Sequence, residues 1–209
     1  MTPQHYVDAI AIPMLPRVHN PWSQVCMWDD RLSGPEERKE RLRSHLDCDP
    51  ALIIVGNSAR YNESRYTGIP FTSEKMILDG LIPRVQLCEG TSRLSKKPAP
   101  FEDKTSEIVW GSLYDHGVAN KTVLFSAVPW HPEGEKPCGS DRIPTYREVQ
   151  LGRIYLQTLI NMYPNAHVAS IGGIAEASLE DLGIAHQKLR DPHRYGFQDL
   201  KDSLKDLAI

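Results

Sequence analysis

The sequence predicts an α/β fold, a three-layer αβα sandwich around a central, mostly parallel four-stranded sheet. Short apolar runs at 52–55, 122–128 and 167–171 are typical of buried parallel strands. Segments with helical spacing of apolar residues separate these runs, and this alternation favours a parallel sheet covered by helices. In such sheets ligands bind beyond the carboxyl ends of the strands. We therefore expect a site in the loops that follow Val55, Val128 and Leu189.

Length and charge restrict the classes of protein that fit. The 209 residues suit one domain with a sizeable core, so we expect 1–209 to form a single domain. Hydrophobic residues make up 40% and charged residues 24% of the chain, an ordinary soluble composition. The net charge of -3 excludes binding to nucleic acid through an overall positive charge. Any DNA binding must use a local basic patch.

The spacing of the cysteines and the length of the apolar runs bear on metal binding, cofactors and membrane association. None of the four cysteines forms a Cys-x-x-Cys pair, so we expect reduced thiols, no metal and no cofactor. Pro13 and Pro16 interrupt the one apolar segment near the N-terminus, and no run approaches the roughly 20 residues that span a bilayer. We expect a cytoplasmic monomer without a membrane role.

The first half of the chain contains few regular elements by pattern. Residues 1–34 are rich in proline and aromatic side chains and are expected to wrap irregularly around the domain. A helix is predicted over 36–46, where Leu42 and Leu46 lie one turn apart. The strand 52–55 ends at Gly56. A surface loop over 90–104 then leads to a helix over 106–114.

The second half is more regular. Pro129 ends the strand 122–128, and a proline- and glycine-rich loop follows over 131–144, long enough to suggest a function. Thr145 and Glu148 have capping-box spacing and open the clearest helix. The later elements are expected as a strand at 167–171, a helix at 174–182, a short strand at 188–189, and an amphipathic helix at 197–207.

Gly56-Asn57-Ser58-Ala59-Arg60 follows the first strand and continues to Thr67–Glu74. A glycine at a strand end lets a ligand approach the backbone closely. Phe71 would lie on a tight loop, where its ring could stack on an extruded base or simply fill the core.

The segments after the other two strands are also rich in polar groups. In Phe125–Pro132, Ser126 can donate and accept hydrogen bonds, and His131 is either a titrating group or a structural one. Leu189–Gly196 combines arginine, aspartate, histidine and tyrosine in one short loop. Such a loop can bind a phosphate backbone and place a carboxylate near a sugar, or be a solvated turn.

Together these segments resemble the motifs of the uracil-DNA glycosylase superfamily. Thr67–Glu74 and Pro144–Glu148 are similar to two of these motifs. Ser126–Pro132 is similar to a third, which has the pattern Asn-Ala-x-Pro-Trp/Phe-His-Pro. A strand and Gly-x-x-Ala turn over 167–175 agree as well. The resemblance runs from about residue 20 to the C-terminus. It implies the superfamily fold, DNA as partner, and hydrolysis of the bond between a base and its sugar.

Three departures from the motifs fall where relatives bind the base or activate water. Ala59-Arg60 stands where Pro-Gly is usual, and Ser126 replaces an asparagine that reads the base edge in relatives. Arg190-Asp191-Pro192-His193 stands where relatives have Arg-His-Pro-Ser or Arg-His-Pro-Ala. These changes fit either retuning for another base or loss of activity.

The resemblance implies a role for each site residue. Asn57 would orient water, Asp191 would act as base or stabilise the cationic sugar, and His193 would donate to the departing base. The base would contact four residues: Ser58, Phe71, Ser126 and His131. Phosphates would contact four cations: Arg60, Lys188, Arg190 and Arg194. Each cation could equally be ordinary surface charge.

The smaller Ser126 would leave room for a modified or bulky pyrimidine, such as a hypermodified base of phage DNA, which would imply an antiviral role. Two alternatives stay open: a uracil-DNA glycosylase of base-excision repair, and a protein that binds modified DNA without cutting it. A nucleotide-binding α/β protein is disfavoured because Gly172-Gly173 is too short for a phosphate-cradling loop.

Overall fold

The computed structural model describes residues 1–136 and 139–205. Four strands form one sheet in the order β3-β2-β5-β6, and every neighbouring pair is parallel. The strands are β2 (Leu52–Ser58), β3 (Thr122–Val128), β5 (His167–Ile171) and β6 (Gln187–Leu189). The predicted fold class is confirmed, and β2 continues three residues beyond the predicted strand, so that Asn57 and Ser58 are part of it.

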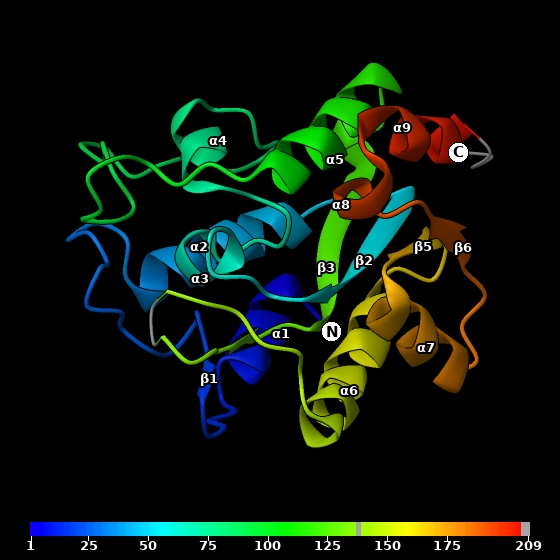
Figure 1. Ribbon diagram of the computed structural model, residues 1–209, viewed down its shortest axis with the longest axis horizontal. Helices are drawn as coiled ribbons and strands as arrows, with labels where there is room; N and C mark the ends of the chain where they lie inside the picture. The colour runs from blue at the N-terminus through cyan, green and yellow to red at the C-terminus, as the bar shows by residue number, and fades with distance from the viewer. Residues whose placement is uncertain (137–138, 206–209) are drawn as a thin grey trace.

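Alternate side chains of the strands enter two hydrophobic cores, one on each face of the sheet. Ile53 and Val55 point to one core, and Leu52 and Ile54 point to the other. The first core is covered by α1 (Pro3–Ile10), α2 (Pro35–Leu46), α6 (Tyr146–Met162) and α7 (Gly173–Asp181). The second is covered by α4 (Glu74–Leu78), α5 (Lys104–Asp115) and α9 (Phe197–Lys205). Figure 1 shows α5 and α9 on one side of the sheet and α6 and α7 on the other.

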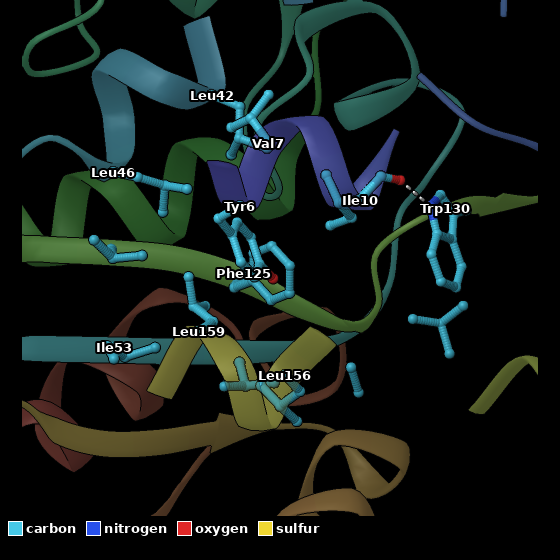
Figure 2. Packing of buried hydrophobic residues seen from close by; sticks show 14 of the residues in the cluster. Tyr6, Val7, Ile10, Leu42, Leu46, Ile53, Phe125, Trp130, Leu156 and Leu159 are labelled. Atoms are coloured by element: carbon cyan, nitrogen blue, oxygen red, sulfur yellow. Dashed lines mark hydrogen bonds between the residues drawn. The ribbon is translucent and has the colours of Figure 1, made fainter. Parts of the chain in front are cut away.

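The expectation of an irregular N-terminal wrap over 1–34 is wrong for α1. The Thr2 side chain accepts a hydrogen bond from the backbone of His5, and Pro3 fits the first turn, so the sequence carries an ordinary helix start. Tyr6 contacts Phe125 of β3 edge to face, with ring centroids 5.9 Å apart. The indole of Trp130 donates to the carbonyl of Ile10 at 2.9 Å (Figure 2). These contacts tie α1 to the first core.

Short elements that the sequence did not predict complete the chain. They are β1 (Val18–His19), α3 (Ser64–Thr67), the 3-10 turn η1 (Ala119–Lys121), β4 (His131–Pro132) and α8 (Pro192–Tyr195). β1 and β4 pair antiparallel outside the main sheet. The capping box of Thr145 and Glu148 is confirmed at the start of α6. Leu207, expected on the last helix, lies outside the described residues.

The helices of the described residues are too short or too polar to cross a membrane.

Candidate active site

Two cavities lie at the carboxyl edge of the sheet and share Asn57 and Asp191. The smaller has a volume of about 300 Å³ and the larger about 560 Å³. The base cavity, as we call the smaller one, is lined by Asn57, Ser58, Arg60, Glu63, Phe71, Thr105, Asp141, Ile171, Asp191 and His193. The basic groove, the larger one, is lined by Asn57, Gly172, Gly173, Glu176, Lys188, Leu189, Arg190, Asp191, Arg194 and Tyr195. The loops after β2, β5 and β6 therefore converge, as parallel strands require.

The amide of Asn57 is fixed against the start of α7. Its Oδ1 accepts hydrogen bonds from the backbone N–H groups of Ile174 and Ala175 at 2.9 and 3.1 Å. A Cβ at Gly172 would lie 2.3 Å from the Asn57 Nδ2, so only glycine leaves space for this amide. With Oδ1 engaged by the helix, Nδ2 is the group that Asn57 can offer to a ligand, and Nδ2 can only donate.

Phe71 forms one wall of the base cavity in a strained backbone conformation. Its φ is 53°, a left-handed value that a non-glycine residue seldom adopts. A Cβ at Gly56 would lie 2.4 Å from the Phe71 ring, so the glycine at the strand end admits this ring and not a ligand. The ring is 8% exposed and lines the cavity, where an aromatic face can stack on a planar group.

Glu63 lies in the base cavity with almost no exposed surface. Burial, and then the nearby carboxylate of Asp103, raise the pKa of Glu63 to about 8. The sequence does not indicate this residue, because a glutamate before a short helix carries no local signal of burial.

Arg60 contacts two carboxylates, and its side chain is 36% exposed. Its guanidinium lies 3.6 Å from the carboxylate of Asp103 and 3.8 Å from that of Asp141. Burial acts to raise the pKa of Asp141, but hydrogen bonds from the His131 side chain and the Tyr61 backbone outweigh it and hold this pKa below the ordinary value. Asp141 lies in the 131–144 loop, and the length of this loop is the sequence feature that could have indicated Asp141.

His131 and Ser126 are not among the residues that line either cavity. Arg65 donates to Nδ1 of His131 at 2.8 Å, and Nε2 of His131 contacts Asp141 at 2.9 Å. Because a guanidinium only donates, His131 carries its proton on Nε2 and donates it to Asp141. His131 therefore positions a cavity carboxylate. Ser126 is buried in β3, opposite Gly56 in the register.

Asp191 and His193 lie together at the start of α8. Asp191 caps this short helix, because its Oδ1 accepts from the backbone N–H of His193 at 2.9 Å. Both side chains line the base cavity, and Asp191 also borders the basic groove. The two residues thus lie near Asn57, as the sequence predicted from the order of the motifs.

The other three predicted phosphate contacts line the basic groove. Lys188 pairs with Glu176, and Arg190 pairs with Asp199 at 3.1 Å. Both cations are more than half exposed, and Arg194 is exposed as well. Surface ion pairs of this kind are weak, so these cations can exchange their partners for phosphates.

The fold and the site define an α/β protein whose ligand site lies at the carboxyl edge of a parallel sheet. Among solved structures, the chain is similar to wild-type SMUG2 from Pedobacter heparinus, with a TM-score of 0.62 and 14% sequence identity. The match covers 98% of this chain and 97% of that chain, so the two proteins share their fold over nearly their whole lengths. No protein-family model matches the sequence, and neither does any curated protein.

Proposed function

We propose that this protein is a DNA glycosylase, which extrudes a nucleotide from DNA and hydrolyses the bond between its base and its sugar. SMUG2 is a glycosylase of the uracil-DNA glycosylase superfamily, and the common fold supports this general activity. The observation that carries the proposal is the meeting of the base cavity and the basic groove at Asn57 and Asp191.

The two cavities suit the two ends of an extruded nucleotide. The base cavity has one aromatic wall and several polar groups, which is what a flipped base needs. The basic groove presents Lys188, Arg190 and Arg194 to the backbone phosphates. A nucleotide bound across both would place its glycosidic bond at their common border, beside Asn57 and Asp191.

The border residues can supply the chemistry of this hydrolysis. As the base leaves, positive charge develops on the sugar. The Asp191 carboxylate faces that charge, and the oxygen not used to cap α8 can take a proton from the attacking water. Asn57 would hold the water or the substrate by donating from Nδ2. His193 would contact the departing base from the same cavity.

The base itself is a narrower part of the proposal. A modified pyrimidine, including a hypermodified base of phage DNA with an antiviral role, remains our prediction. The replacement of asparagine by the smaller Ser126 does not provide space for such a base, because Ser126 is not among the residues that line the base cavity. The base cavity has a volume of about 300 Å³, at the lower end of the range for small-ligand sites, so its size does not by itself favour a bulky substituent.

The test is excision by the purified protein. Oligonucleotides would carry uracil, 5-substituted uracils, 5-substituted cytosines or glucosylated hydroxymethylcytosine, and abasic sites would be scored by alkaline cleavage. We expect cleavage on at least one modified base, with a loss of about 100-fold or more in Asp191→Asn. Asp8→Asn, an exposed change on α1, is the matched control and should match wild type. Absence of abasic sites on every substrate would overturn the proposal.

One observation favours the alternative of a protein that binds modified DNA without cutting it. The Asn57 Oδ1, which could accept from water, is occupied by the start of α7. Tight binding to a modified oligonucleotide without abasic sites would establish this alternative. Excision of uracil in preference to every modified base would instead establish the uracil-DNA glycosylase alternative.

A further inference from the structure

Glu63 presents a buried carboxyl group to the base cavity, and the described residues give it one long hydrogen bond. Its exposed fraction is 2%, and the contact is 3.5 Å from the Ser106 Oγ. That hydroxyl has a single proton and lies 2.8 Å from the Asp103 carboxylate, which is the better acceptor. The Glu63 carboxyl is therefore left with the cavity as its main polar contact.

An unpaired buried carboxylate is costly, and the surrounding charges do not relieve it. Asp103 and Asp141 are like charges on neighbouring elements, and Arg60, whose charge acts to lower the pKa of Glu63, is shared between them. Burial and these carboxylates together raise the pKa of Glu63 to about 8. At neutral pH most of the population thus carries a proton on this carboxyl, facing the space proposed for the base.

The charges around the base cavity disfavour a base that leaves as an anion. Asp141 and Asp191 both line the cavity, and the charge of Arg60 is already offset. A base that receives a proton as it leaves becomes neutral and avoids this repulsion. Such a base needs a ring nitrogen that can accept the proton.

We propose that Glu63 is the catalytic acid that protonates the departing base, and that the cavity selects a base with a ring-nitrogen acceptor beside an exocyclic amino group, of the cytosine type. A carboxylic acid fits that edge with two hydrogen bonds: its O–H donates to the ring nitrogen and its C=O accepts from the amino group. This inference rests on the proposed glycosylase function and names its substrate class.

The bond between the sugar carbon and the base nitrogen breaks, and its electron pair moves to the base. The Glu63 proton passes to the ring nitrogen beside the amino group, so that the base leaves neutral. Water forms the new bond to the sugar carbon and gives its proton to Asp191. Exchange with solvent then returns a proton to Glu63 and removes one from Asp191.

The experiment compares wild type with Glu63→Gln on two matched oligonucleotides, one with 5-hydroxymethylcytosine and one with 5-hydroxymethyluracil. The bases share the 5-substituent and differ at the edge that Glu63 would read. We expect wild type to prefer the cytosine member, with a single-turnover rate that falls as pH rises through about 8. Glu63→Gln should be slower by about 100-fold or more, lose that alkaline fall, and bind DNA as wild type does.

The stability of Glu63→Gln is measured over the same pH range as its single-turnover rate. Because the pKa of Glu63 is raised on folding, its contribution to stability is fully present below about 4.5 and is lost as pH rises through about 8. Glu63→Gln removes this loss, so at pH 9 it should melt at or above the wild-type temperature. Glu107→Gln, exposed on α5, is the control and should retain the wild-type rate.

The outcomes separate the two proposals. A Glu63→Gln variant with the wild-type rate and pH profile, or a preference for the uracil member, would overturn this inference and leave the glycosylase function intact. A wild-type protein that makes no abasic site on any base would overturn the function, and the inference with it.

Discussion

At the scale of single residues, the base cavity depends on a contact between Gly56 and Phe71. The absent side chain at Gly56 lets the Phe71 ring approach the end of β2, and the backbone of Phe71 has a strained φ of 53°. The ring and the strand end are thereby positioned together. A glycine that the sequence suggested for ligand access is used for packing one wall of the site.

Gly56→Ala should therefore affect both stability and excision. The new Cβ would lie within 2.7 Å of two ring carbons of Phe71, so the ring must move. We expect a cost of about 1–3 kcal/mol in the free energy of unfolding, as for overpacked cores. Excision should fall as well, because the wall that we propose to stack on the base is displaced. Urea denaturation and single-turnover kinetics measure the two effects.

A double-mutant cycle identifies the cause of that loss. In a Phe71→Leu background the ring is absent, so Gly56→Ala should cost clearly less stability than it does in wild type. If the cost is the same in both backgrounds, the collision with the Phe71 ring is not the reason for glycine at this position.

At the scale of elements, the approach of α6 to β3 depends on Gly152. A Cβ there would lie 2.1 Å from the Ala127 carbonyl oxygen, a backbone atom that cannot rotate away. Gly111 in α5 is a matched contrast, since the nearest atom to its Cβ would be in ordinary contact at 3.7 Å. Both glycines lie inside helices, where alanine is intrinsically better by about 0.5–1 kcal/mol.

The two alanine substitutions should therefore differ in their effect on stability. Gly152→Ala should lower the melting temperature by several degrees or prevent folding, because α6 must move off the sheet. Gly111→Ala should leave the melting temperature unchanged or raise it slightly. Thermal unfolding followed by circular dichroism measures both, and equal shifts would show that the close approach of α6 does not limit stability.

The long elements could be predicted from the sequence because their signals are local. Apolar runs marked the strands, and the capping residues of Thr145 and Glu148 marked α6. α1 was missed although Thr2 and Pro3 form a helix start, because the proline-rich residues after it suggested an irregular segment. The four-residue helices α3 and α8 lack a full periodic pattern, so no apolar spacing could indicate them.

The site was predictable where it follows strand ends and unpredictable where it depends on burial. Motif order placed Asn57 and Asp191 together, because parallel strands end at one edge. The environment of Glu63 arises from contacts with α5 and the 131–144 loop, which no local pattern encodes. The carboxylates that surround Arg60 are likewise distant in sequence, so no local pattern separates Arg60 from the predicted phosphate contacts.

At the scale of the whole molecule, the net charge of -3 opposes an anionic partner. The proposed DNA binding would then depend on the cations of the basic groove, close to the border with the base cavity. Because each neutralised phosphate releases counterions, the salt dependence of binding counts the contacts made. The salt dependence of binding in variants therefore tests which cations contact the DNA phosphates.

Lys188→Ala and Arg194→Ala should each reduce the slope of log K against log salt by about 0.7–0.9, because each removes one phosphate contact. Arg60→Ala should leave this slope unchanged, because Arg60 faces Asp103 and Asp141 within the base cavity. Arg43→Ala, a partly exposed change on α2, controls for the loss of one positive charge. Fluorescence anisotropy over a salt series measures all four slopes. If the Arg43 variant lowers the slope as much as the groove variants do, the basic groove is not where the phosphates bind.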